Sequence, residues 1–264
     1  MMSKKIKNIL SKKNKSKLIC LTAYSKNIAK IIDKYCDIIL VGDSLANVLY
    51  AHKNTHSIKL ENIIQHSSSV KLGVKNSLLV VDMPKGTYPN AKIALKNAKV
   101  VMSATRCDAI KIESNKKNYQ IIEMLVKKKI PVMGHIGFTP QFKKNFKIQG
   151  LSKTEINKLK KEAISIQKAG AFSIVLECLS PAAAKIVTNS LHIPTIGIGS
   201  SVYCDGQILV TDDMLGISGF YPKFVKKYAR LDTIIEKAVK KYTKDVKSKK
   251  FPRIKNFLYG SKFR

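Results

Sequence analysis

The stretch Ile-Ile-Leu-Val-Gly-Asp-Ser, residues 38–44, decides how the chain is expected to fold. Its apolar run has the length of a strand buried on both faces, as in a parallel sheet covered by helices. Gly42 lets the backbone turn without steric cost, so Asp43 and Ser44 follow directly beyond the strand. In open α/β sheets and in α/β barrels, ligands bind at this carboxyl end of the strands. The stretch therefore predicts a parallel sheet with a functional site beside Asp43.

Seven more stretches have the character of short buried strands. They cover residues 17–24, 77–83, 109–113, 131–137, 172–179, 194–199 and 208–211. Helical patterns alternate with them over residues 25–34 (with Ser25 as the cap), 61–72, 91–105, 116–128, 154–168 and 181–190, and a last helix is expected from Pro222. Eight strands alternating with helices predict an α/β fold, the (β/α)8 barrel, with an open doubly wound sheet as the alternative.

The length of 264 residues fits a single barrel. We expect one domain over residues 1–264. A polar N-terminal segment, residues 1–16, is expected to form a short helix over one end of the core. A Lys-rich C-terminal tail is expected over about residues 231–264.

Basic residues dominate the charge of the chain, because 49 Lys and Arg stand against 17 Asp and Glu, a formal net charge of +32. A polyanion such as RNA, DNA or an anionic membrane is one possible partner. Arg, the residue that contacts phosphates and guanine edges bidentately, occurs only at positions 106, 230, 253 and 264. The lysines are also scattered over most predicted helices. We therefore favour compositional drift and no specific nucleic-acid partner, and keep a nucleic-acid-binding protein as the less favoured class.

The five cysteines are odd in number and widely spaced, at positions 20, 36, 107, 178 and 204, with no C-x-x-C pair. This pattern favours reduced thiols of a cytoplasmic enzyme over a disulfide framework or a structural zinc site. The basic N-terminus is not followed by an apolar segment, and no stretch reaches the ~18 apolar residues of a membrane span. We expect a cytoplasmic protein without a membrane partner.

Four carboxylates lie at the ends of predicted strands: Asp43, Asp82, Glu113 and Glu177. Each alone has a structural explanation, since Asp is common in turns, but a barrel would bring all four to one mouth. Crowded carboxylates repel one another and raise each other's pKa. A hard cation such as Mg²⁺, which prefers oxygen ligands, relieves that repulsion. The four positions therefore predict a divalent metal site.

Other polar residues lie near the same ends. Lys111 precedes Glu113 by two residues, so both side chains point the same way from their strand. For His135 we favour a hydrogen-bonded orienting role over metal ligation, and His52 is open to either. The glycines of GIG, residues 197–199, lack the third glycine and the downstream acid of a dinucleotide site, and favour close packing at a strand end instead.

Eight stretches between about Leu18 and Arg230 resemble the ketopantoate hydroxymethyltransferase (3-methyl-2-oxobutanoate hydroxymethyltransferase) family, in the family's order. They are LTAYS, ILVGDSL, VVDMP, AIKIE, PVMGHIGFTPQ, IVLECL, IPTIGIGS and DGQILVTDDMLGI. The resemblance implies a (β/α)8 barrel of the phosphoenolpyruvate-mutase and isocitrate-lyase type, assembled as a decamer of two five-membered rings. It also implies transfer of a hydroxymethyl group from 5,10-methylenetetrahydrofolate to 3-methyl-2-oxobutanoate, the first step of pantothenate synthesis.

The same resemblance implies roles for individual residues. It implies Mg²⁺ held by Asp43, Asp82 and Glu113, the 2-oxo acid contacted by Asp43, Ser44, Asp82 and Lys111, and Glu177 as the general base. The alternative within this fold is a related Mg²⁺-dependent C–C lyase or phosphonomutase acting on a 2-oxo acid.

Three positions depart from the family's pattern. Ala51 stands where Gly usually precedes the loop histidine, Lys85 replaces an apolar residue, and the loop after Gln141 is shorter.

Overall fold

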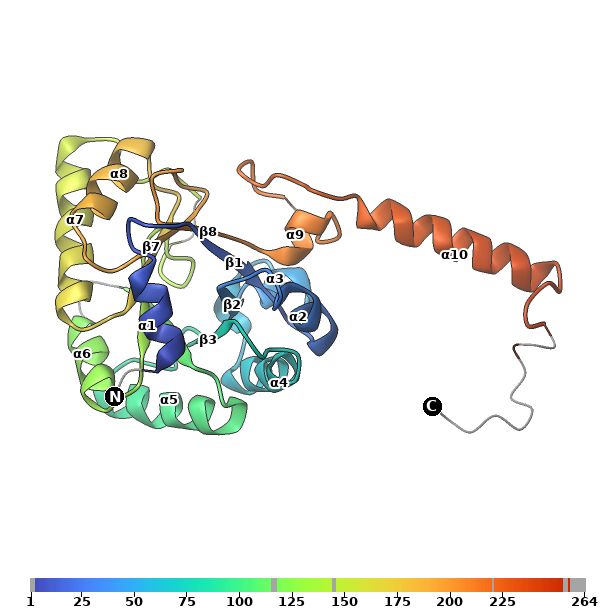
Figure 1. The fold of residues 1–264 in the computed structure, drawn as a ribbon, viewed down its shortest axis with the longest axis horizontal. Coiled ribbons are helices and arrows are strands. Elements are labelled where there is room, and N and C mark those ends of the chain that lie inside the picture. The colour runs from blue at the N-terminus through green and yellow to red at the C-terminus, as the bar shows by residue number, and fades with distance from the viewer. Residues whose placement is uncertain (1–2, 115–117, 144–145, 220, 254–255, 257–264) are drawn as a thin grey trace. The chain divides into compact units, whose positions relative to one another are not determined.

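The computed structural model describes residues 3–114, 118–143, 146–219, 221–253 and 256. Within them, eight parallel strands are hydrogen-bonded in sequence order and close into a barrel (Figure 1). The strands are β1 (Leu18–Thr22), β2 (Ile38–Val41), β3 (Leu78–Asp82), β4 (Ala109–Glu113), β5 (Val132–Gly137), β6 (Ser173–Glu177), β7 (Thr195–Ile198) and β8 (Gly206–Leu209). Parallel pairing of β1 with β8 closes the ring. The predicted (β/α)8 barrel is confirmed, and the open sheet is wrong.

Helices follow most of the strands, as the alternating pattern predicts. They are α1 (Lys4–Ser11), α2 (Lys26–Ile32), α3 (Leu45–Val48), η1 (Thr55–Ser57), α4 (Leu60–Lys71), α5 (Ala91–Thr105), α6 (Tyr119–Lys127), α7 (Lys153–Lys168), α8 (Pro181–Asn189), α9 (Thr211–Leu215) and α10 (Leu231–Lys247). The predicted start of the helix over 116–128 lies outside the described residues.

One predicted helix cap forms without its side-chain hydrogen bond, and the predicted element ends at Pro222 and Thr211 are wrong. Ser25 is the N-cap residue of α2, but its side chain makes no cap hydrogen bond. The last helix begins at Leu231 and not at Pro222. Thr211 begins α9 instead of ending β8, because its N–H donates to Thr22 Oγ1 at 3.1 Å and its hydroxyl to the carbonyl of Thr22.

The N-terminal segment closes the amino end of the barrel, as predicted. Ile6 and Ile9 of α1 are buried in the cluster that holds the first residues of several strands, including Leu18, Ile38 and Leu78. Three lysines of this segment form ion pairs with aspartates that directly precede strands. The pairs are Lys5 with Asp108 (3.5 Å), Lys12 with Asp37 (2.5 Å) and Lys13 with Asp205 (2.8 Å). Some of the many lysines of the chain therefore form ion pairs within the fold.

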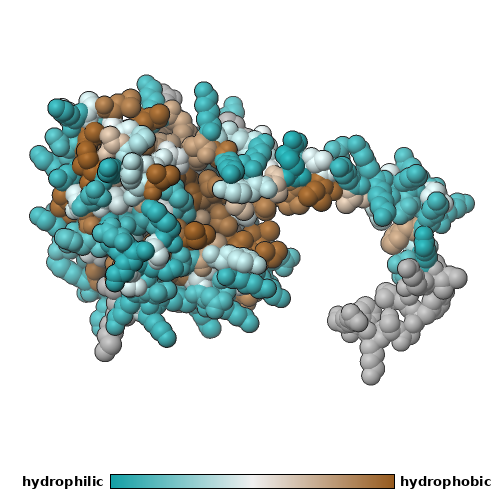
Figure 2. Space-filling model, turned by 45° about the horizontal axis from the view of Figure 1, so that its top comes forward, coloured by the Kyte–Doolittle hydropathy of each residue, from teal (hydrophilic) through white to brown (hydrophobic). Residues whose placement is uncertain are grey.

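Contacts within the chain define two compact units, residues 1–211 and residues 212–264. The barrel belongs to the first, and α10 belongs to the second; the expectation of one domain over the whole chain stays a prediction. Figure 2 shows hydrophilic residues spread over the visible surface with hydrophobic ones between them. Among the described residues, no helix combines the length and the apolar character needed to cross a bilayer.

Candidate active site at the barrel mouth

The carboxyl ends of neighbouring strands bring the predicted site residues together. Asp82, Glu113 and Glu177 are the last residues of β3, β4 and β6, and Asp43 follows β2 by two residues. The strand register places Asp82 beside Lys111. The side chains of Asp43, Asp82, Lys111, Glu113 and Glu177 are all buried. Charged side chains buried to this degree need partners, because an isolated charge is costly in a medium of low polarity.

Asp82 forms the centre of the first group of contacts. Lys111 Nζ donates to Asp82 Oδ1 at 2.5 Å, and the backbone N–H of Asp43 donates to Asp82 Oδ2 at 3.1 Å. Gly42 lies next to this contact: a Cβ at that position would lie 2.9 Å from Ser44 Oγ and 3.5 Å from Asp82 Oδ2. A larger residue at position 42 would therefore displace the Ser44 hydroxyl, whereas its contact with Asp82 would be an ordinary one.

Ser44 directly follows Asp43 and is the N-cap residue of the short helix α3. Its Oγ lies 2.8 Å from the hydroxyl of the buried Tyr24, which follows β1. This contact fixes the Ser44 hydroxyl next to the carboxylates.

Burial, together with the charges of neighbouring carboxylates, raises the pKa of three of these carboxyl groups. Burial, reinforced by the charge of Asp82, raises the pKa of Asp43 to about 6. Burial and the nearby carboxylates raise the pKa of Glu113. Burial raises the pKa of Glu177 to about 8, although Lys111 acts in the opposite direction. Repulsion of this kind is relieved when a cation joins the group.

Lys111 stays protonated in this setting. Burial alone would lower its pKa, but the charges of Asp82, Asp43 and Glu113 outweigh burial, so the pKa of Lys111 is raised. Lys111 is therefore a permanent positive charge among four carboxyl groups.

His135 lies between two of the glutamates. Its Nε2 is 3.1 Å from Glu177 Oε2 and its Nδ1 is 3.7 Å from Glu113 Oε1, yet within the described residues neither nitrogen makes a hydrogen bond of suitable angle. Burial, with Lys111 nearby, lowers the pKa of His135, which favours the neutral ring. His52, by contrast, lies 2.6 Å from Ser57 Oγ within its own loop. The orienting role of His135 stays a prediction.

Gln141 is a site residue that the sequence reasoning missed. It is fully buried in the connection from β5 to α7, and its side chain donates to Asp43 Oδ2 at 2.9 Å. Its backbone N–H donates to Glu113 Oε2 at 3.0 Å. The only signal in the sequence is its place at the end of the stretch PVMGHIGFTPQ.

The donor set at the mouth fits Mg²⁺ in its chemistry. Mg²⁺ is usually held by one or two carboxylates and keeps several waters. Asp43 and Asp82 are both buried, and the backbone N–H of Asp43 donates to Asp82 Oδ2, which places the two residues side by side. Among the described residues, no three or more His, Cys, Asp or Glu side chains form a ready-made metal cluster. The residues therefore fit an ion that takes two ligands from protein carboxylates and its other ligands from water or substrate oxygens. They fit less well an ion whose ligands all come from protein side chains.

The structure describes the surroundings of two positions that depart from the family pattern. Ala51 has φ +53°, a conformation that glycine adopts more easily. Lys85 Nζ lies 3.1 Å from His56 Nδ1, and His56 Nε2 lies 2.9 Å from the carbonyl of Pro140. Lys85 thus helps to join the η1 loop to the loops after β3 and β5.

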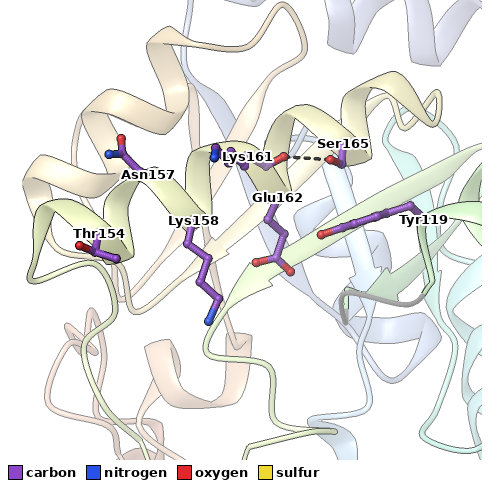
Figure 3. Close-up of a pocket in the computed structure, with 7 residues that line it drawn as sticks. All are labelled: Tyr119, Thr154, Asn157, Lys158, Lys161, Glu162 and Ser165. Carbon is purple, nitrogen blue, oxygen red and sulfur yellow. Dashed lines mark hydrogen bonds between the residues drawn. The ribbon is translucent and has the colours of Figure 1, made fainter.

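A cavity of about 580 Å³ lies apart from these residues (Figure 3). Its lining comes from α6 and α7: Tyr119, Thr154, Asn157, Lys158, Lys161, Glu162 and Ser165. Tyr119 and Glu162 point toward one another across it in Figure 3. Because these helices lie outside the strands, the cavity is separate from the group of carboxylates.

Comparisons with known proteins cover nearly the whole chain. A family model described as "Ketopantoate hydroxymethyltransferase" matches residues 3–254. A protein of Pelagibacter ubique (strain HTCC1062) named 3-methyl-2-oxobutanoate hydroxymethyltransferase is 52% identical over 255 residues, covering 97% of this chain and 99% of the relative. A protein of the same name from Anaplasma marginale (strain St. Maries) is 45% identical over 250 residues, covering 94% of this chain and 90% of the relative.

Solved structures with the same fold are more distant in sequence. Phosphoenolpyruvate phosphomutase from Streptomyces platensis subsp. rosaceus aligns with a TM-score of 0.64 at 10% identity, over 92% of this chain and 87% of the other. A 2,3-dimethylmalate lyase, titled a member of the PEP mutase/isocitrate lyase superfamily, aligns with a TM-score of 0.61 at 11% identity, over 98% of this chain and 92% of the other. These similarities concern the fold and confirm the predicted type of barrel.

Proposed function

Because the chain belongs to the ketopantoate hydroxymethyltransferase family, we propose that it transfers a hydroxymethyl group from 5,10-methylenetetrahydrofolate to 3-methyl-2-oxobutanoate with Mg²⁺ at the barrel mouth. The chain is a transferase enzyme, and ketopantoate formation is the activity for which its relatives are named. The observation that carries the proposal is the buried group of Asp43, Asp82 and Lys111, with Glu113 and Glu177 beside it.

In this proposal, Asp43 and Asp82 hold the metal, and Glu113 is the third acidic position. When bound, Mg²⁺ supplies a Lewis acid that polarises the ketone of the 2-oxo acid. The hydroxyl of Ser44 and the ammonium group of Lys111 bind the substrate together with Asp43 and Asp82. The contacts of Ser44 with Tyr24 and of Lys111 with Asp82 keep both donors in place before substrate arrives.

Glu177 is the general base in this scheme. Its carboxylate removes the proton from C3 of the 2-oxo acid, and C3 then forms a bond to the methylene carbon of the folate donor. The two C–N bonds to that carbon break, water supplies the hydroxyl oxygen, and tetrahydrofolate leaves. A base works best when its pKa lies near the working pH, and burial raises the pKa of Glu177 to about 8. The charge of Lys111 offsets the negative charge that develops on the substrate, which is the type of electrostatic stabilisation that lowers reaction barriers.

The competing activities have less support. A C–C lyase or phosphonomutase shares the barrel with this chain, but at 10–11% identity those structures support the fold alone. A homodecamer and a cytoplasmic location remain proposals that follow from the family resemblance, and native mass spectrometry of the purified chain tests the first.

The decisive assay is ketopantoate formation by the purified protein, followed by mass spectrometry with and without the folate donor and with and without EDTA. We expect product only with the folate donor and free Mg²⁺. Asp43→Ala and Asp82→Ala should each shift the Mg²⁺ titration to higher concentration. Breakdown or rearrangement of a 2-oxo acid without folate, with no ketopantoate formed, would replace the proposed reaction with a lyase or mutase.

A further inference from the structure

Every hydrogen-bonding group of the Gln141 side chain is used at the barrel mouth. One hydrogen of Nε2 goes to Asp43 Oδ2 at 2.9 Å and the other to the carbonyl of Met83 at 3.0 Å. The amide oxygen, Oε1, accepts the hydroxyl of Tyr88. Gln141 itself is 0% exposed, although it comes from a loop and not from a strand.

These partners fix the direction of the amide. The carbonyl of Met83 and an ionised Asp43 can only accept hydrogen bonds, so the NH₂ group must face them. A flipped amide would turn its oxygen toward two other oxygens and lose both bonds. Burial raises the pKa of Tyr88, which keeps its hydroxyl protonated as the donor to Gln141 Oε1. Tyr88 therefore holds the amide in the one orientation that serves Asp43.

The backbone of the same residue reaches a second acid. The N–H of Gln141 donates to Glu113 Oε2 at 3.0 Å, and Met83, which the side chain also contacts, directly follows Asp82. One loop residue thus connects the ends of β2, β3 and β4. The donor groups of Gln141 are neutral. They can therefore orient the carboxylates without repelling a bound cation, whereas the positive charge of a lysine would repel it.

We propose that Gln141 is a positioning residue for the divalent cation site, with Tyr88 acting through it. Gln141 holds the carboxylates of Asp43 and Glu113 in the direction from which they receive the ion. This inference rests on the proposed function, because it takes the acids at the barrel mouth as metal ligands.

The test is binding of Mn²⁺, used as a probe of the Mg²⁺ site, measured by the loss of the free-ion signal in electron paramagnetic resonance. We expect Gln141→Met, which keeps the length of the side chain but has no amide, to weaken Mn²⁺ binding by about 10- to 100-fold, the usual loss when a group that orients a metal ligand is removed. Tyr88→Phe should weaken it several-fold. In the double variant, Tyr88→Phe should add nothing, because its effect passes through the amide.

Gln149→Met is the matched control. Gln149 lies in the same connection, but its side chain donates to the carbonyl of Lys147 and accepts from Lys143, so among the described residues none of its side-chain hydrogen bonds goes to a carboxylate. We expect wild-type Mn²⁺ affinity in this variant. In Gln141→Met, raising the Mg²⁺ concentration should restore most of kcat for ketopantoate formation, which a general loss of structure would not allow.

Unchanged Mn²⁺ affinity in Tyr88→Phe overturns the proposal even where Gln141→Met fails to fold, and equal losses in Gln149→Met overturn it as well. The enzyme assay separates these outcomes from failure of the proposed function. If the wild-type protein forms ketopantoate with Mg²⁺ and Gln141→Met binds Mn²⁺ with wild-type affinity, only the positioning role of Gln141 is overturned. Wild-type protein that binds no Mn²⁺ overturns the positioning role and the metal assignment together.

Discussion

Replacement of Glu177 by glutamine should stop proton removal while leaving the substrate site intact. Glutamine has the same size, but it cannot take a proton. We expect the exchange of the C3 hydrogen of 3-methyl-2-oxobutanoate with solvent to fall by about 10²- to 10⁴-fold, the usual contribution of a general base. Because this half-reaction does not need the folate donor, it separates proton removal from one-carbon transfer.

The pH dependence follows from the surroundings of Glu177. Burial raises its pKa from 4.5 to about 8, with Asp43 and Asp82 adding to the effect and Lys111 opposing it. In the protein without metal, a group with a pKa near 8 is ionised in roughly a tenth of molecules at pH 7 and in roughly nine tenths at pH 9. Only the ionised form acts as a base, so activity should rise as the pH rises through the pKa of Glu177. A bound divalent cation favours the carboxylate, as Lys111 does, so Mg²⁺ should move the midpoint to lower pH.

Two measurements check these expectations. Proton NMR in D₂O with Mg²⁺ follows the C3 exchange, and the infrared difference between wild type and Glu177→Gln follows the titration of the carboxyl group without metal. Glu61→Gln is the matched control, since Glu61 is an exposed glutamate on α4. Exchange at the wild-type rate in Glu177→Gln, or a metal-free midpoint near 4.5, would refute the reasoning.

Three further outcomes are expected. Asp33→Asn should lower the free energy of unfolding by about 2–4 kcal/mol in denaturant titrations, because Asp33 accepts the backbone N–H groups of residues 75–77 and bonds to a charged group contribute about 1.5–3 kcal/mol. Burial acts to raise the pKa of Asp33, but these hydrogen bonds outweigh burial and lower the pKa. The stabilisation should therefore be present above about pH 4 and be lost as the pH falls through the folded-state pKa of Asp33. A difference in stability between Asp33→Asn and wild type that persists in acid would contradict this. Ala51→Gly should stabilise the protein by about 0.5–1 kcal/mol in the same titrations, because Ala51 has φ +53°; a lower stability would show that the strain is absent. Removal of metal by EDTA should abolish ketopantoate formation, and added Mg²⁺ should restore it; activity that persists in EDTA would exclude the metal role of Asp43 and Asp82.

The strands were predictable because their sequences carry the signal that forms them. Apolar residues form much of most strands, and in β2 to β6 every residue is buried, so the apolar stretch and the strand largely coincide. The amphipathic pattern of α5 gave both of its ends correctly, Ala91 and Thr105. The eight parallel pairs then follow from the alternation of strands and helices.

The connections were less predictable, since their structure depends on partners distant in the sequence. None of the helices predicted from the sequence lies between residues 45 and 60, yet this connection contains α3 and η1. Pro222 offered a plausible helix start, yet the helix begins at Leu231. Helices as short as α3 and η1 have almost no periodicity of their own, and tertiary contacts decide where they begin.

The same distinction explains which parts of the site the sequence could reveal. Asp43, Asp82, Glu113 and Glu177 are visible because strands in a barrel end at one common rim, so their convergence follows from the fold. Gln141 reaches the same rim from a loop, and its contact with Asp43 spans 98 positions along the chain. No spacing rule connects the two residues; only the folded position of Tyr88 and of the loop after β5 does so. The acids of such a site can therefore be found from strand ends, whereas the neutral residues that orient them require the structure.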